Sequence, residues 1–145
     1  MNRYIVALSV GLCALMAAAA GLSAQDAKTT SIWDGIYTEA QAARGEAIYK
    51  QECTLCHRDD LRGNIDGGPP LRGLEFFIRW RQISLKDMVT DISWLMPNDD
   101  PGSLSRQAYV DIMAFLFRDN GIPAGAVEMP VEDVALSQII FTEKQ

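Results

Sequence analysis

The sequence is poor in histidine and cysteine, the residues that build most transition-metal sites. It contains one histidine, His57, and three cysteines among 145 residues. A zinc site needs about four nitrogen, sulfur or oxygen ligands, so only carboxylates remain to complete one here. A pair of histidine ligands around any metal is excluded for the same reason. Metal chemistry in this chain must therefore be built around His57 and its neighbours, Cys53 and Cys56.

The N-terminus carries the pattern of a secretory signal peptide. Arg3 precedes an apolar run from Tyr4 to Ala20, and small residues follow that run. This pattern predicts a signal peptide at 1–24 and a single exported domain at 25–145. An uncleaved membrane anchor is the alternative, because the run lies at the lower length limit for a spanning helix. Cleavage would leave the protein in the periplasm without a membrane span.

Cysteine is too scarce for a disulfide framework. Cys13 lies within the apolar run and is lost on cleavage, so the mature chain keeps Cys53 and Cys56. A disulfide between residues this close in sequence would close almost no loop and would contribute little stability. We therefore expect both thiols to serve chemistry rather than cross-linking.

Positive charge is scarce as well. The chain has 13 basic and 19 acidic side chains, which gives a formal net charge of −6. An acidic chain is a poor partner for nucleic acid or for an anionic membrane surface. The charge is compatible with a basic protein partner.

Helical patterns dominate the rest of the chain, and no stretch alternates convincingly enough to predict a sheet. A first helix is predicted to begin after Thr38, which forms a capping box with Gln41. Gly45 would weaken this helix unless a second helix approaches closely, since a glycine lets two backbones meet. We therefore expect an all-α fold with a helix crossing at Gly45.

Two further helices follow a loop at 58–73. Ser84 is predicted to cap the first of them, and Ser105 is predicted to cap the last long helix, which Gly121 ends. The tail from 124 to 145 predicts extended chain or a short helix folded over the body.

The segment CTLCH, residues 53–57, allows three interpretations. A zinc site lacks ligands, as argued above. A thioredoxin-like dithiol requires the motif at the start of a helix that follows a strand, whereas here it follows a predicted helix. Two thiols at this spacing can also add to the vinyl groups of one haem, which makes the adjacent histidine an iron ligand. We therefore expect one haem c, attached through Cys53 and Cys56 and ligated by His57.

A ligating histidine is usually held by an acceptor at its other ring nitrogen. The segment GGPPLRG follows the motif closely, and a proline carbonyl in that loop can accept this hydrogen bond. We favour Pro69 as the acceptor; an ordinary surface turn is the alternative.

The sixth iron position must be filled by methionine or lysine or left open, because the chain has no second histidine. Met88 and Met113 occupy apolar positions of predicted helices and are expected in the core. Met96 and Met129 each precede a proline in irregular chain. We expect Met96 to be the ligand, because its loop between two helices can swing over the haem; Met129 is the alternative.

Residues 31–125 resemble a class I c-type cytochrome. The matching segments occur in the family's order: GEAIYKQECTLCH, PPLRG, LMP and YVDIMAFLF. The tail from about 126 is then a C-terminal extension that the minimal fold does not need. The resemblance implies that the N- and C-terminal helices cross through four residues, Gly45 and Tyr49 from one and Ile112 and Phe115 from the other.

The haem of such a protein is expected behind an apolar wall that excludes water. This wall and the thioether of Met96 would both raise the reduction potential. Pro69 and Leu71 match the family's loop on the histidine side. Trp80 can donate to a haem propionate or serve as an ordinary core residue. The residues expected in the wall are Leu71, Phe76, Phe77, Trp80, Ile92, Trp94 and Leu95.

The implied function is electron transfer rather than catalysis. The segments SIWDGIYTEAQAARG and MPNDDPGSLS resemble small exported cytochromes that occur alone or fused to quinoprotein dehydrogenases. We expect a one-electron shuttle between a periplasmic dehydrogenase and an oxidase or other cytochrome. The protein would be a monomer or a subunit of a dehydrogenase complex. A haem-based sensor or enzyme with a labile distal ligand is the alternative.

Four acidic residues are predicted to lie near the exposed haem edge. They follow the haem motif and Met96 in the segments RDD and NDD. Such acids either steer a basic redox partner to the haem edge or are merely solvated loop charges. The four are Asp59, Asp60, Asp99 and Asp100.

Overall fold

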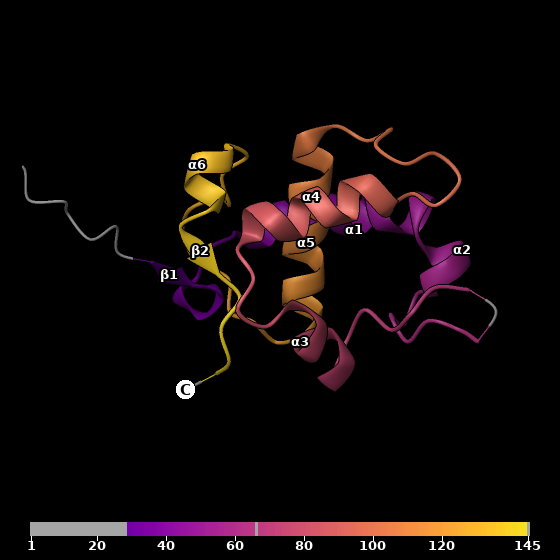
Figure 1. Cartoon of the computed structure of the whole chain (residues 1–145), viewed down its shortest axis with the longest axis horizontal. Coiled ribbons are helices and arrows are strands. Elements are labelled where there is room, and N and C mark those ends of the chain that lie inside the picture. The colour runs from indigo at the N-terminus through magenta and orange to yellow at the C-terminus, as the bar shows by residue number, and fades with distance from the viewer. Residues whose placement is uncertain (1–28, 66, 145) are drawn as a thin grey trace, which may run out of the picture.

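The computed structural model describes residues 29–65 and 67–144, and the predicted signal peptide lies outside them. These residues form a helical body with a small sheet at one end (Figure 1). None of their helices is both long and apolar enough to cross a membrane. The elements are β1 (Thr30–Ser31), the 3₁₀ turn η1 (Ile32–Asp34), α1 (Glu39–Glu52), α2 (Thr54–His57), α3 (Leu74–Trp80), α4 (Leu85–Leu95), α5 (Arg106–Asp119), α6 (Asp133–Leu136) and β2 (Ile139–Ile140).

The three predicted N-caps are confirmed. The side chains of Thr38, Ser84 and Ser105 each accept a hydrogen bond from the backbone N–H three residues later. The cap residues have extended backbones and satisfy N–H groups that the first turn leaves without partners. At the other end of α5, Gly121 has a φ of 73° and ends the helix as predicted.

The crossing of α1 and α5 forms the centre of the body. A Cβ on Gly45 would lie 1.8 Å from the backbone oxygen of Asp111, so no larger residue fits at this approach. One turn further along α1, the rings of Tyr49 and Phe115 lie 5.0 Å apart between centroids. The predicted crossing is confirmed, and it fixes the C-terminal end of α1, from which the CTLCH segment continues.

The predicted capping box at Thr38 is wrong in its second half. Gln41 is fully buried, and its amide turns to the tail instead of to the backbone of Thr38. Its Nε2 donates to the carbonyl of Met129 (3.2 Å), and its Oε1 accepts from the Met129 N–H (2.8 Å). The buried backbone of the tail needs these partners, and Gln41 is the side chain that supplies them.

The tail is packed into the body rather than laid loosely over it. Figure 1 shows α6 and β2 beside β1, at the end of the molecule away from α2. β2 pairs in parallel with β1, a sheet too short for any alternating pattern to reveal. Phe141 is buried and packs against the rings of Phe76 and Phe117. This end of the molecule is therefore a closed core, whereas the other end holds a cavity.

Candidate functional site

A cavity of about 700 Å³ lies between the end of α1, α2, α3, the end of α4 and one face of α5. This volume lies within the range of small-molecule and cofactor sites. The loop after α4 completes its lining. All seven residues that the sequence predicts for haem binding line the cavity: Cys53, Cys56, His57, Pro69, Leu71, Trp80 and Met96.

α2 is a single helical turn that carries Cys56 and His57, and Cys53 is the N-cap residue directly before it. Residues three and four apart lie on one face of a helix, so Cys53, Cys56 and His57 come together. Both cysteines are half-buried free thiols, not joined in a disulfide. Burial, followed by the neighbouring Glu52 and Cys56, raises the pKa of Cys53 to about 11. Reactive cysteines have the opposite shift in pKa, so this environment does not activate the Cys53 thiol.

The ring of His57 is fixed by the loop that follows. His57 is 5% exposed, and its Nδ1 lies 2.8 Å from the carbonyl oxygen of Pro69, the acceptor that the sequence predicts. A carbonyl can only accept, so Nδ1 carries a proton, and in the neutral imidazole Nε2 then keeps its lone pair. A Cβ on Gly68 would lie 2.4 Å from Cε1 of the ring. Gly68 is thus required for this packing, a role that was not predicted from the sequence.

Tyr49 supports the same segment from α1. Its hydroxyl donates to the carbonyl of Arg58 at 2.7 Å, directly after His57. Arg58 has a φ of 63°, a conformation that is unfavourable for a residue with a side chain. The hydrogen bond from Tyr49 helps to hold this turn, and the ring also lines the cavity.

Asn120 holds the other side of the loop. Its side chain donates to the carbonyl of Leu71 (3.0 Å) and accepts from the backbone N–H of Gly73 (2.8 Å). The end of α5 is thereby tied to the segment that carries Pro69. No sequence pattern points to this role, because Asn120 looks like an ordinary residue before a helix-ending glycine.

Met96 lines the cavity from the end of α4, as the sequence predicts. The alternative, Met129, is 2% exposed and lies in the tail, where its backbone pairs with Gln41. It is not among the residues that line the cavity. Met88 and Met113 are fully buried core residues, as predicted.

Two residues of the predicted apolar wall lie elsewhere. Phe77 stacks on Trp33 with ring centroids 6.0 Å apart, and it also packs against Phe141 of the tail. Trp94 is 78% exposed and lies on the outer side of α4. Both predictions are wrong, because neighbouring helical positions point in different directions. The other wall residues line the cavity: Leu71, Phe76, Trp80, Ile92 and Leu95.

Trp80 is 5% exposed and lines the cavity. Its indole N–H has no hydrogen bond to any residue in the described part of the chain, and the guanidinium of Arg79 lies 4.8 Å from its ring. In the same part of the chain, no buried side-chain nitrogen or oxygen lacks a partner. The N–H is therefore reachable from the cavity or from solvent, and Arg79 adds a positive charge beside it.

These residues fit a haem by their chemistry. The cavity offers two free thiols, an imidazole with a free Nε2, a thioether and an apolar lining, and its N–H and guanidinium donors suit carboxylates. Four contacts of this site were not predicted: those of the Tyr49 hydroxyl, of Gly68, of the Asn120 side chain and of the Tyr109 hydroxyl, which donates to the carbonyl of Met96. Only Gly68 left a signal, as a glycine directly before the two prolines.

Comparison with known proteins agrees with this chemistry. A family model described as cytochrome C oxidase, cbb3-type, subunit III matches residues 40–116, more than half of the chain. Cytochrome c-551 of Bacillus subtilis (strain 168) is 39% identical over 59 residues, which are 41% of this chain and 50% of that protein. The chain thus spans about half the length of this curated relative. No solved structure matches the present chain. The chain belongs to the c-type cytochrome family and is a small class I cytochrome.

Proposed function

We propose that this protein is an exported monohaem cytochrome that carries single electrons between a periplasmic dehydrogenase and a terminal acceptor. In this proposal Cys53 and Cys56 attach the haem, and His57 and Met96 ligate its iron. The observation that supports it best is the position of His57. Its Nδ1 is held 2.8 Å from the Pro69 oxygen, beside two free thiols and in the same cavity as Met96.

The residues of the cavity have separate roles in this proposal. The two thiols tether the group, so that it stays bound in both oxidation states. The Pro69 carbonyl orients the imidazole and raises the basicity of Nε2. Bound haem iron supplies a one-electron couple between its ferrous and ferric states. The thioether of Met96 favours the ferrous state, and the apolar wall keeps water from the site.

Arg79 and Trp80 are the side chains best suited to the carboxylates of the haem. Both line the cavity, and each offers N–H donors with no hydrogen bond to another residue in the described part of the chain. Pairing with Arg79 would reduce the cost of holding a negative group beside an apolar wall.

The rim of the cavity is acidic, which supports docking of a basic redox partner. Glu52, Asp91 and Asp99 line the cavity and are exposed, against one exposed base, Arg79. None of the three acids forms an ion pair within the described residues. Asp60 is different, because Arg62 lies 3.8 Å from its carboxylate. The steering surface would therefore centre on the rim and the loop after Met96.

The proposal also keeps the predicted domain organisation. A signal peptide at 1–24 would direct export, and residues 25–145 would form one domain. The segment from about 126 would be a C-terminal extension that completes the core at the end away from α2.

Acid–acetone extraction of the purified exported protein tests the proposal. Covalent attachment predicts that the haem stays on the polypeptide and gives a pyridine haemochrome spectrum typical of haem c. Cys53→Ala and Cys56→Ala should each weaken this retention. A protein whose haem is fully extracted, or one that purifies without haem, would overturn the proposal.

A further inference from the structure

The loop between α4 and α5, residues 96–105, is held to the body by few polar contacts. The N–H of Met96 closes the last turn of α4 on the carbonyl of Ile92 at 2.8 Å. Beyond Met96, the backbone hydrogen bonds are local turns: Asp100 to Pro97 and Ser103 to Asp100. The carbonyl of Met96 accepts from the N–H of Gly102 only at 3.5 Å, longer than a normal hydrogen bond. Tyr109 supplies the short contact, since its hydroxyl donates to the same carbonyl at 2.7 Å.

No other side chain in the described part of the chain makes a hydrogen bond to residues 96–104. Tyr109 lies on α5, which packs closely against α1 at Gly45, so the donor belongs to the helix crossing at the centre of the body. The ring is 3% exposed. The packing of α5 against α1 sets the position of the Tyr109 hydroxyl. The hydroxyl can therefore hold the loop in one position.

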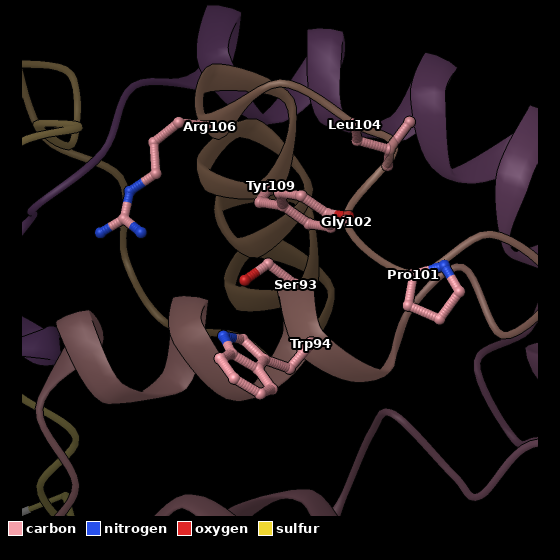
Figure 2. A pocket seen from close by; sticks show the side chains of 7 residues that line it. All are labelled: Ser93, Trp94, Pro101, Gly102, Leu104, Arg106 and Tyr109. Atoms are coloured by element: carbon pink, nitrogen blue, oxygen red, sulfur yellow. The ribbon is translucent and has the colours of Figure 1, made fainter.

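A second cavity shows why this contact matters. Figure 2 shows a groove between the end of α4, the start of α5 and the loop, with Tyr109 across its middle, Trp94 below it and Gly102 and Pro101 on the loop beside it. The groove has a volume of about 410 Å³. Tyr109 and Leu104 line both this groove and the haem cavity, so they form the wall between the two. The loop therefore has little packing behind it.

We infer that Tyr109 is a positioning residue for Met96: its hydroxyl holds the Met96 backbone where the thioether can reach the haem iron. This inference rests on the proposed ligation by Met96. Tyr109 does not touch the reacting atoms; it acts through the carbonyl of the residue that does. Loss of the hydroxyl should favour the arrangement in which the Met96 segment has moved away.

Imidazole titration of the oxidised holoprotein at neutral pH measures this equilibrium. Added imidazole binds iron only when Met96 leaves, so its apparent affinity reports how firmly Met96 is held. Tyr109→Phe keeps the ring and removes one hydrogen bond. Apparent imidazole binding should become about fivefold tighter, which at 1.4 kcal/mol per tenfold corresponds to about 1 kcal/mol.

Tyr37→Phe is the matched control. Tyr37 is fully buried, and its hydroxyl donates to the carbonyl of Ile122, also at 2.7 Å, but it does not line the haem cavity. Both variants should lose similar thermal stability, and only Tyr109→Phe should change imidazole affinity. Equal imidazole affinities for the two variants would overturn the inference.

Met96→Ala separates the inference from the proposed function. If Met96 is the ligand, this variant should bind imidazole at least tenfold more tightly, because nothing competes. If Met96→Ala matches the wild type, the ligand assignment itself fails, and the inference with it. If Met96→Ala binds imidazole more tightly but Tyr109→Phe does not, the ligation by Met96 stands and only the positioning role of Tyr109 is contradicted.

Discussion

His57 and Met96 line the same cavity, but the segments that carry them are held in different ways. Around His57, the Pro69 carbonyl fixes the ring, Gly68 packs on its face and the hydroxyl of Tyr49 holds the following turn. The Met96 segment is tied by one short side-chain hydrogen bond and has a groove behind it. Side chains and close packing constrain the His57 segment several times over, whereas a single side-chain hydrogen bond constrains the Met96 segment beyond the end of α4.

This difference indicates where each kind of change should act. A segment held by several contacts keeps its position when one hydrogen bond is lost, because the other contacts remain. An added atom should displace it, because the closely packed neighbours leave no space. A segment held by one side-chain hydrogen bond should be displaced more easily when that bond alone is lost. The predictions below test both halves, from the largest expected effect to the smallest.

Gly68→Ala should have the largest effect. The new methyl group would lie 2.4 Å from the ring of His57, so the ring or the loop must shift. Overpacking of this kind costs about 1–3 kcal/mol of unfolding free energy, and displacement of the ring should also lower the yield of haem-bearing protein. Denaturant unfolding and the haem content of the exported protein measure both effects.

Gly67→Ala is the control for that change. Its added methyl group would first meet the far end of the exposed Asn64 side chain, 2.7 Å away, and not the ring of His57. Near-normal haem content is therefore expected. If the two alanine variants behave alike, the tight packing of Gly68 on His57 is not what secures the ligand.

Tyr49→Phe should have an intermediate effect that differs in kind from that of Tyr109→Phe. It removes a hydrogen bond of the same length, 2.7 Å, from the His57 side of the cavity. Stability should fall by about 1 kcal/mol, while imidazole affinity stays within about twofold of wild type, because the His57 segment keeps its other contacts. Tighter imidazole binding in Tyr49→Phe would contradict the difference between the two segments.

The parts of this site that the sequence predicted are those set by local chemistry. The spacing of the two thiols and the imidazole in residues 53–57 predicts the site, and Gly45 predicts a close helix crossing. Contacts between distant segments leave no such signal. Gln41 matched a local capping pattern, yet its side chain forms hydrogen bonds to the buried backbone of the tail instead.

The apolar wall shows the same limit. Hydrophobicity marks Phe77 and Trp94 as core residues, but it does not indicate which core they join. Phe77 belongs to the cluster around Trp33 and Phe141, and Trp94 lies at the surface. Tyr109 fitted a hydrophobic position at the start of a helix, so nothing in the sequence revealed the bond from its hydroxyl to Met96.

The smallest effect is expected from Asp99→Asn with Asp100→Asn. Both acids are exposed on the Met96 loop, and neither forms an ion pair within the described residues. Electron transfer to a cationic probe, tris(phenanthroline)cobalt(III), should slow about twofold to fivefold at low salt, and this difference should shrink as salt screens the charges. Stability and midpoint potential should stay nearly unchanged.

Asp59→Asn with Asp60→Asn is the paired comparison for the rate. Because Arg62 already lies near the carboxylate of Asp60, this change should slow the reaction less. A rate that ignores salt and both pairs of substitutions would mean that encounter occurs through apolar contacts and that the acids serve solubility.

The near-red sulfur-to-iron charge-transfer band of the oxidised protein tests the central claim most directly, because it arises only when a methionine ligates the haem iron opposite histidine. We predict that the wild-type protein and Met129→Ala show this band and that Met96→Ala lacks it while keeping its covalent haem. A band that survives in Met96→Ala and disappears in Met129→Ala would contradict the account, as would a wild-type protein with no band.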